Sequence, residues 1–356
     1  MMDHATWMLR CSQLARNGAG LVAPNPLVGA VLVQGDRILA EGWHKRYGGP
    51  HAEVECLRQF GDGAVPQDAV MYVNLEPCAH FGKTPPCTDL LIERGVKHVV
   101  IGQRDPFPEV AGKGIEKLKA AGITVETGVE EEACRWQQRR FLTSVEKGRP
   151  YIILKWARSA DGFLDQQPRQ GRVVQRISND TSHILVHRWR SEEQAIMVGS
   201  RTVINDDPQL TTRLVHGRQP LRVVLDRAGV TPAGSKVYDR TTPTLLFTRA
   251  LRADLKHVEQ VTIADDDPLK VLLQELHQRG IRSMLVEGGA GLLNAFLAQG
   301  LWDEARVITG TASFGNGTPT PIGLPPPQRT LDLDGDMMHL HVNTNMHQNV
   351  DPTWYW

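Results

Sequence analysis

Apolar runs typical of strands alternate with segments of helical apolar spacing along the first 145 residues of the chain. Two of these runs flank the turn Gly35-Asp36 and predict a β-hairpin. The predicted strands of this part lie at 30–34, 37–43, 70–76 and 98–103. The predicted helices lie near the N-terminus and at 51–60, 88–95 and 114–122. Strands that alternate with helices favour an α/β sheet covered by helices on both faces.

A second α/β series follows the segment EKGRP at 146–150, whose charges, glycine and proline make it the best candidate for a domain boundary. Its strand-like runs lie at 151–157, 194–199, 221–226, 244–248, 283–289 and 304–309. Its helical segments lie near 179–190, 267–279 and 291–299. The predicted domains are therefore 1–146 and 147–356, and no sequence period relates one to the other.

Composition favours a globular protein that acts on a small molecule. The chain has 356 residues, 41% of them hydrophobic, which is enough for two domains with their own cores. Its 40 basic and 40 acidic residues balance, so we expect no broad basic face for a nucleic acid. We expect no membrane span and no signal peptide, because no apolar stretch is long enough. Five cysteines, an odd number, indicate a reducing cytoplasm.

A group of histidine and cysteine residues in the first half has the composition of a catalytic zinc site, which needs three protein ligands and one open position. His51 follows Pro50, and Glu53 stands two positions later. His51 and Glu53 can face one centre only if His51 lies at the non-helical entry of its helix. Cys78 follows a proline after a predicted strand, and Cys87 precedes a predicted helix whose dipole favours the thiolate. This combination is the signature of zinc deaminases, in which the glutamate shuttles a proton.

Other interpretations of these residues stay open at this point. Taken singly, each cysteine is more typical of a small buried hydrophobic residue, and His51 of a surface histidine. Cys56 lies three residues after Glu53 on the same helix, so helical phase does not exclude it as a ligand. Cys56, Cys11 and Cys134 are nevertheless better interpreted as core residues.

Four stretches of the first half resemble the deaminase half of the bifunctional riboflavin-biosynthesis deaminase/reductases, the RibD family. The resemblance covers nearly all of 1–145, and the long spacer ending in TPPC separates this family from nucleoside and tRNA deaminases. The stretches are APNPLVGAVLV (23–33), GWHKRYGGPHAEVECL (42–57), NLEPCAHFGKTPPCTDLLIERGV (74–96) and DPFPEVAGKGIEKLKAAGI (105–123).

The resemblance implies a cytidine-deaminase-like three-layer α/β/α domain that removes the 2-amino group of 2,5-diamino-6-ribosylamino-4(3H)-pyrimidinone 5′-phosphate by hydrolysis. Glu53 would carry a proton from the attacking water to the ring nitrogen and the departing ammonia. The zinc ligands would be His51, Cys78 and Cys87. The substrate contacts of this half would be Asn25, His44 and Lys83.

The second half contains a strand, a Gly-Gly turn and a helix at 283–297, an arrangement that presents backbone N–H groups to a phosphate. Together with KWARSADG (155–162), VGSRTVINDDPQLTTR (198–213) and LRVVLD (221–226), it resembles the reductase half of the same family. The resemblance implies a dihydrofolate-reductase-like α/β domain that uses NADPH to reduce the ribosyl group to a ribityl chain. The cofactor contacts would be Arg158, Ser159, Thr202, Asp206, Gly289, Ala290, Gly291 and Leu292. The substrate contacts would be Arg190, Leu210, Arg213 and Glu287.

Three features depart from the family pattern and concern the nicotinamide side of the pocket. Arg176 stands where an aromatic residue is usual, the stretch 165–176 is long and basic, and 309–319 replaces an apolar segment. No arginine or lysine can be assigned to the 2′-phosphate, so the sequence does not distinguish NADPH from NADH.

Two alternatives remain. One is a zinc nucleobase, nucleoside or tRNA deaminase fused to a non-catalytic nucleotide-binding domain. The other is a structural zinc module, which would need a fourth ligand, with His80 as the obvious candidate. We expect a homo-oligomer, because the family and the two predicted sites favour one.

Overall fold

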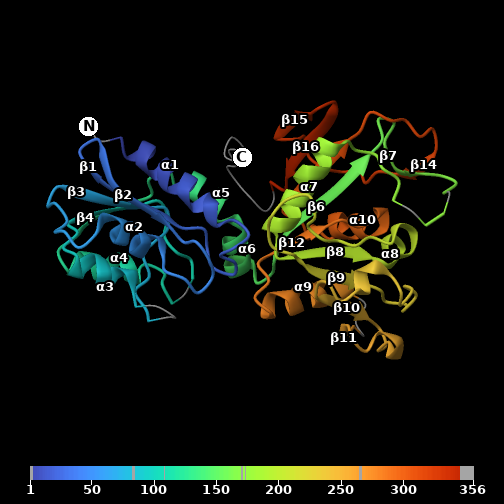
Figure 1. The fold of residues 1–356 in the computed structure, drawn as a ribbon, viewed down its shortest axis with the longest axis horizontal. Coiled ribbons are helices and arrows are strands. Elements are labelled where there is room, and N and C mark those ends of the chain that lie inside the picture. The colour runs from blue at the N-terminus through green and yellow to red at the C-terminus, as the bar shows by residue number, and fades with distance from the viewer. Residues whose placement is uncertain are drawn as a thin grey trace. The chain divides into compact units, whose positions relative to one another are not determined.

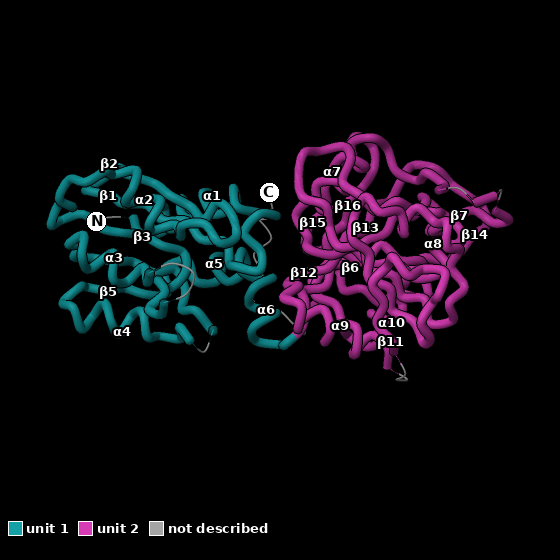
Figure 2. Tube along the Cα trace, turned by 60° about the horizontal axis from the view of Figure 1, so that its bottom comes forward, with its two compact units in different colours: residues 1–148, 349–356 teal, residues 149–348 magenta. Residues whose placement is uncertain are grey.

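The computed structural model describes residues 3–81, 85–107, 109–169, 171–172, 174–263 and 267–344. The chain divides into two compact units between Gly148 and Arg149, shown in different colours in Figure 2. Each unit has its own sheet and its own buried apolar clusters. None of the helices in the described ranges is long and apolar enough to cross a membrane.

The first unit is built on a five-stranded sheet in the order β2-β1-β3-β4-β5. The β1–β2 hairpin turns at Gly35-Asp36, as predicted, because glycine adopts the positive φ of 59° that this turn needs. Strand β1 is antiparallel to β2 and β3, whereas β3, β4 and β5 are parallel. The strands are β1 (Gly29–Gln34), β2 (Arg37–Trp43), β3 (Ala69–Val73), β4 (His98–Ile101) and β5 (Thr124–Thr127).

Helices cover both faces of this sheet and give the predicted three-layer α/β/α arrangement (Figure 1). On one face α1 packs Met8, Cys11 and Leu14 against strand residues, with Cys134 of α5 in the same cluster. On the other face α2, α3 and α4 bury residues such as Leu57 against the opposite side of the strands. The helices are α1 (His4–Ala15), α2 (Ala52–Phe60), α3 (Cys87–Glu93), α4 (Lys113–Ala120), α5 (Glu131–Gln137) and α6 (Arg139–Lys147).

The second unit contains a nine-stranded sheet in the order β11-β10-β9-β8-β12-β6-β13-β16-β15. The first seven strands in this order, from β11 to β13, are parallel to one another. Strands β16 and β15 add an antiparallel edge. The strands are β6 (Tyr151–Arg158), β8 (Ala195–Gly199), β9 (Leu221–Leu225), β10 (Thr244–Thr248), β11 (Glu259–Thr262), β12 (Ser283–Val286), β13 (Glu304–Thr309), β15 (Arg329–Leu333) and β16 (Asp336–Val342). Parallel strands bring their carboxyl ends to one edge of the sheet, where ligands of α/β proteins bind.

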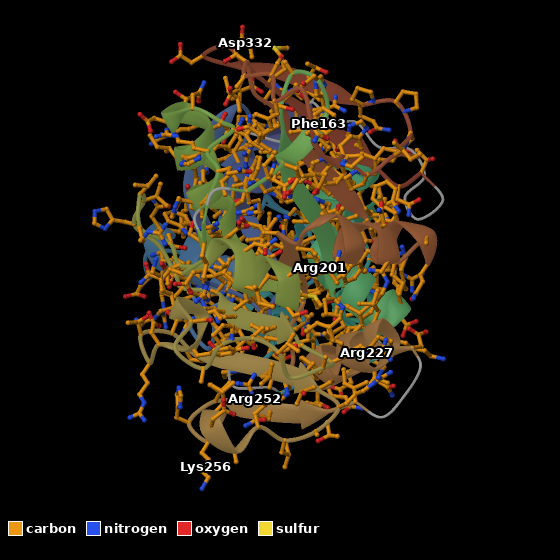
Figure 3. All side chains as sticks on the ribbon, turned by 90° about the vertical axis from the view of Figure 1, so that its right-hand side faces the viewer. Phe163, Arg201, Arg227, Arg252, Lys256 and Asp332 are labelled. Atoms are coloured by element: carbon orange, nitrogen blue, oxygen red, sulfur yellow. The ribbon has the colours of Figure 1, made fainter. Side chains whose placement is uncertain are left out.

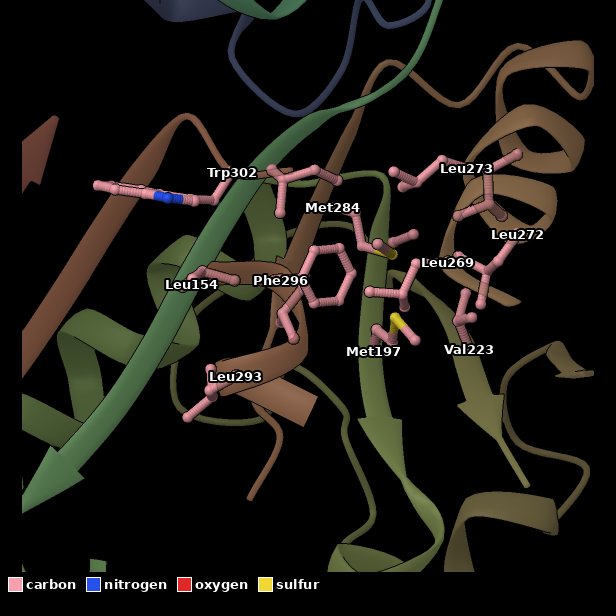
Figure 4. Packing of buried hydrophobic residues seen from close by; sticks show 14 of the residues in the cluster. Leu154, Met197, Val223, Leu269, Leu272, Leu273, Met284, Leu293, Phe296 and Trp302 are labelled. Atoms are coloured by element: carbon pink, nitrogen blue, oxygen red, sulfur yellow. The ribbon is translucent and has the colours of Figure 1, made fainter. Parts of the chain in front are cut away.

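The larger core of this unit lies between the sheet and helices α9 (Pro268–Gln278) and α10 (Ala290–Ala298). Figure 4 shows Leu269, Leu272 and Leu273 of α9 and Phe296 of α10 pointing toward Met197 and other strand residues. On the opposite face Val203 of α8 (Ser200–Asp206) belongs to a second cluster. Helix α7 (Asp180–Glu192) completes the unit.

The two segments that depart from the family pattern lie against each other. Strand β7 (Phe163–Gln166) pairs with β14 (Gly317–Pro319), so the basic stretch and the altered C-terminal segment form a small antiparallel sheet. Asp161 reinforces this contact, because its carboxylate accepts hydrogen bonds from the N–H groups of Phe314 and Gly315. The Arg176 side chain donates hydrogen bonds to Asp180 and to the carbonyl of Ser178.

Candidate functional site

The predicted metal ligands converge in the first unit. His51 Nδ1, Cys78 Sγ and Cys87 Sγ all lie within 4.8 Å of one another, and this is the single such group found among the described residues. The distances from His51 Nδ1 are 3.6 Å to Cys78 Sγ and 3.3 Å to Cys87 Sγ. Two sulfur atoms and one imidazole nitrogen at these separations are the donor set that zinc prefers.

Local structure explains why these three side chains meet. His51 is the residue that precedes α2, with an extended backbone (φ −75°, ψ 168°), which confirms its predicted place at the non-helical entry. Cys87 is the first residue of α3, and Cys78 lies in the loop after β3. The backbone N–H of Cys87 donates to Cys78 Sγ at 3.3 Å, so the helix start stabilises the neighbouring sulfur atom.

The two thiols respond differently to this environment. The hydrogen bond from the Cys87 thiol lowers the pKa of Cys78, and hydrogen bonds from His51 and the Cys87 N–H lower it further. The same pairing and burial raise the pKa of Cys87. One thiolate is therefore favoured before any cation is present, and a bound cation would favour the second.

Glu53 stands in the first turn of α2 with its carboxyl group buried at 3% exposure. Burial raises the pKa of Glu53, while the neighbouring His51 lowers it. A carboxyl group whose pKa is raised in this way is suited to accept and return a proton near neutral pH.

The rival ligands do not join the group. Cys56 Sγ points to the carbonyl of Ala40 at 3.4 Å, and burial raises the pKa of its thiol to about 12. His80 is likewise absent from the cluster, although it lies in the same loop as Cys78. In the described part of the chain the group thus has three protein ligands, which leaves a fourth position for water, as a hydrolytic site needs and a closed structural site does not.

Asn25 and His44 lie beside this group and form a connected pair. His44 is buried, its ring stands 5.4 Å from the His51 ring at 80°, and its Nδ1 lies 2.8 Å from the Pro50 carbonyl. Because the carbonyl can only accept, His44 Nδ1 carries the proton and Nε2 accepts from the Asn25 amide at 3.1 Å. Burial lowers the pKa of His44, which favours its neutral form. Asn25 is therefore held with its side-chain carbonyl oxygen available to a ligand. The third predicted substrate contact of this unit, Lys83, lies outside the described residues.

A buried charge cluster in the second unit unites several predicted substrate residues. Arg190 donates two parallel hydrogen bonds to Glu287, at 2.7 and 2.8 Å, and its Nη1 donates to the carbonyl of Thr211. Burial alone would raise the pKa of Glu287, but Arg190 and Lys155 outweigh it and lower the pKa to about 2. Arg213 lies nearby and is more exposed. Partial burial lowers the pKa of Arg213, and the positive charge of Arg190 lowers it further. Leu210 is buried in the same segment.

Lys155 is a candidate that the sequence analysis missed. Its Nζ lies 4.0 Å from Glu287 Oε2, its side chain is 13% exposed, and burial lowers its pKa. No acceptor among the described residues is within hydrogen-bond distance of this ammonium group, so its donors are available to a ligand. The sequence did indicate this residue, because a lysine stands inside the apolar strand YIILKWA and charged residues are rarely buried without a function or a partner.

The predicted nucleotide residues gather at the carboxyl edge of β8, β12 and β6. The Gly289 N–H donates to Thr202 Oγ1 at 3.0 Å, and Gly289 directly precedes α10, whose first residues are Ala290, Gly291 and Leu292. A Cβ atom on Gly288 would lie 2.7 Å from the Leu292 side chain, which explains why a glycine stands at this position, directly before Gly289. The arrangement presents the N–H groups of a nine-residue helix to an anion.

Three other predicted cofactor residues already have partners within the protein. The Ser159 hydroxyl is buried and bonds Asp161 Oδ1 at 2.6 Å, so it stabilises the turn after β6. Arg158 Nε donates to Thr309 Oγ1, and Asp206 accepts from Arg169. Through the Arg169–Asp206 pair the basic stretch is attached to the end of α8.

Comparisons with known proteins cover nearly the whole chain. A family model described as the RibD C-terminal domain matches residues 150–353, and one described as the cytidine and deoxycytidylate deaminase zinc-binding region matches 1–103. Riboflavin biosynthesis proteins RibD of Aquifex aeolicus and Synechocystis are 40% and 38% identical to this chain. The alignments cover 87% and 99% of it and 88% and 95% of the relatives.

Solved structures give the same picture. A diaminohydroxyphosphoribosylaminopyrimidine deaminase/5-amino-6-(5-phosphoribosylamino)uracil reductase of Thermotoga maritima superposes with a TM-score of 0.85 at 38% identity, covering 95% of this chain and 98% of that one. RibD of Acinetobacter baumannii superposes with a TM-score of 0.85 at 36% identity, with the same coverage.

Proposed function

Because the chain belongs to the RibD family of riboflavin biosynthesis proteins, we propose that its first unit carries the deaminase site and its second unit the reductase site. The protein is a bifunctional enzyme that deaminates the diaminopyrimidinone ribosylamino phosphate and then reduces the ribosyl group to ribityl with NADPH. The observation that carries the proposal is the convergence of His51, Cys78 and Cys87 beside the buried carboxyl group of Glu53.

We assign His51, Cys78 and Cys87 to zinc and Glu53 to proton transfer. Zinc, when bound, makes water a stronger nucleophile at neutral pH. Glu53 is not needed as a ligand, so its carboxylate can take a proton from the attacking water and deliver it to the ring nitrogen and the leaving ammonia. Asn25, oriented by His44, offers a carbonyl oxygen to a donor on the pyrimidine.

In the second unit NADPH supplies the hydride, and we assign its phosphates to the Gly289–Leu292 turn with Thr202. We assign Lys155 and Arg213 to the phosphate of the substrate, and Glu287 to a hydrogen-bond donor of the substrate, because its carboxylate can only accept. Arg190 acts mainly through Glu287, because both of its parallel N–H groups are committed to that carboxylate. Lys155 and Arg213 are the better phosphate contacts, although Nη1 of Arg213 already donates to Thr211 Oγ1 at 2.8 Å.

The experiment that tests this function measures two products of one chain. The zinc-loaded protein is incubated with the diaminopyrimidinone ribosylamino phosphate, first without and then with NADPH. We expect one ammonia to be released per substrate with and without NADPH. When NADPH is present, one NADPH should be oxidised for each ammonia released, and only after that release. NADPH oxidation without prior ammonia release, or no ammonia at all, would contradict the proposed order.

Zinc content should depend on the proposed ligands alone. Cys78→Ala is expected to lower bound zinc from about one per chain to well below one after dialysis, because it removes the favoured thiolate. Cys56→Ala is the matched control, since that thiol is buried and bonded to Ala40. Zinc is measured by atomic emission. Equal zinc in both variants would remove Cys78 from the ligand set.

The His44–Asn25 pair should act as a unit in substrate binding. His44→Ala and Asn25→Ala are each expected to raise the KM of deamination about tenfold, because one hydrogen bond that orients the amide or the ligand is lost. The double variant should be no worse than Asn25→Ala, since His44 acts through Asn25. Multiplicative effects in the double variant would mean that His44 contacts the substrate independently.

We propose the cytoplasm as the location and a homo-oligomer as the assembly. All five cysteines are unpaired in the structure, which supports a reducing compartment. The proposed partner is a phosphorylated pyrimidine.

A further inference from the structure

The connection between α8 and β9 carries two predicted substrate residues in a backbone conformation that other side chains must hold. It contains no helix or strand, and it follows α8, whose Arg201 is labelled in Figure 3. Leu210 in this connection has a φ of 55°, which is uncommon for a residue other than glycine, and its side chain is buried at 2% exposure. Such a conformation persists only where the surrounding contacts determine it.

Gln219 holds the middle of this connection with a pair of hydrogen bonds. Its Oε1 accepts from the Thr212 N–H, and its Nε2 donates to the Thr212 carbonyl, both at 2.8 Å. The side-chain amide therefore bonds Thr212 as a neighbouring strand would. Because the two bonds involve two consecutive peptide groups, they fix the backbone angles of Thr212 between them.

Helix α7 supplies the remaining partners of these two peptide groups. Arg190 Nη1 donates to the Thr211 carbonyl at 3.2 Å, and His187 Nδ1 accepts from the Arg213 N–H at 2.9 Å. The Arg190 guanidinium also pairs with Glu287, so the connection is attached to the buried charge cluster. Each backbone donor and acceptor of the two peptide groups is thus bonded to a side chain, which fixes the position of the Arg213 Cα atom.

The contact with Arg213 also determines the proton arrangement of His187. A backbone N–H can only donate, so Nδ1 is unprotonated and the proton of the neutral imidazole is on Nε2. Burial and the positive charges of Arg190 and Arg213 lower the pKa of His187 to about 4, although Glu287 opposes the shift. The neutral form, which can accept from the backbone, is therefore favoured.

The fixed backbone restricts the Arg213 side chain as well. Its Nη1 donates to Thr211 Oγ1 at 2.8 Å and to Gln209 Oε1 at 3.4 Å, whereas Nε and Nη2 have no acceptor among the described residues. The charges of Arg190 and Glu287 act on this guanidinium, which places it at the proposed substrate site. Donors that are oriented before a ligand arrives lose less conformational entropy on binding.

We propose that His187 and Gln219 are positioning residues of the reductase, which hold the backbone of 211–213 so that Arg213 meets the substrate phosphate without rearrangement. This inference rests on the proposed reductase function and on the assignment of Arg213 to the phosphate. Neither His187 nor Gln219 needs to touch the substrate. Their loss should therefore weaken binding of the phosphate and leave hydride transfer unchanged.

The test compares two substrates that differ only in the phosphate. NADPH oxidation by the full-length, zinc-loaded chain is followed with the deaminated pyrimidine phosphate and with the same compound lacking its phosphate. His187→Leu and Gln219→Ala should each raise the KM of the phosphorylated compound about tenfold, with kcat and the KM of the other compound within about twofold of the unaltered chain. His187→Asn should restore the low KM, because the asparagine Oδ1 is an acceptor near the place of Nδ1.

Controls and a double variant separate positioning from a general loss of stability. His216→Leu and Gln274→Ala replace an exposed histidine of the same connection and an exposed glutamine of α9, and both should leave the two KM values unchanged. His187→Leu combined with Arg213→Gln should have the KM of Arg213→Gln alone, because His187 acts through Arg213. If thermal unfolding shows that His187→Leu does not fold, Gln219→Ala decides, since Gln219 is exposed.

The outcomes distinguish this inference from the function on which it rests. An unchanged KM in the folded variants, equal losses for both compounds, or effects that multiply in the double variant would overturn the positioning role while NADPH oxidation by the unaltered chain stands. If the unaltered chain does not oxidise NADPH with the deaminated phosphate, the proposed reductase function fails together with this inference.

Discussion

Glu53→Gln should reduce ammonia release by about 10²- to 10⁴-fold while about one zinc per chain remains bound. The carboxylate is the proposed proton carrier, and it is buried beside the three ligand atoms without being one of them. Glutamine has nearly the same volume and keeps a polar group in the pocket, but it cannot take up a proton at neutral pH. Ammonia release and zinc content are measured on the same sample.

Glu55→Gln is the control for this substitution. Glu55 lies on the same helix, but its carboxylate pairs with Lys45 and Arg58 and does not belong to the group of ligand atoms. Its replacement should leave ammonia release within about twofold of the unaltered chain, as expected for surface ion pairs. If the Glu53→Gln variant also loses zinc, Glu53 is part of the metal site. If the variant keeps full activity, Glu53 has no role in the mechanism.

Glu287→Gln should strongly slow reduction and destabilise the second unit. The substitution leaves Arg190 and Lys155 buried without their shared counter-charge. Breaking a buried pair in this way costs about 3–5 kcal/mol of folding free energy. We expect NADPH-dependent reduction to fall by about 10²-fold or more, while ammonia release continues. Glu275→Gln, which affects only a surface pair with Arg279, is the control.

The same substitution has a predictable pH dependence. The pKa of Glu287 is lowered to about 2 in the folded chain, from 4.5. A carboxyl group with a lowered pKa contributes stability that is fully present above its unfolded pKa and is lost as pH falls through the folded value. The stability difference between the unaltered chain and Glu287→Gln should therefore shrink between about pH 4.5 and 2. A difference that grows on acidification would contradict the ion pair.

The parts of the fold that the sequence predicted are those in which local pattern and tertiary environment agree. Strands such as β10 and β13 have the predicted bounds, because their apolar runs are buried on both faces. The hairpin of β15 and β16 was missed, although Asp334-Gly335 between alternating residues is a two-residue turn signal. Short, half-exposed strands such as β11 carry too few apolar positions to be recognised.

The zinc group was predictable because its ligands are chemically distinctive and stand at helix and strand ends. The Arg190–Glu287–Lys155 cluster was only partly predictable, since its members are far apart in the sequence and meet through strand order.

The central claim is that one chain holds two separate active sites, and product analysis of two variants tests it most directly. Each variant is incubated with NADPH and the diaminopyrimidinone phosphate, or with its deaminated product, and the pyrimidines are identified by mass spectrometry. Glu287→Gln should accumulate the deaminated, unreduced compound, and Glu53→Gln should reduce the supplied deaminated compound at the normal rate. The claim is contradicted if Glu287→Gln stops ammonia release, or if Glu53→Gln no longer reduces the deaminated compound.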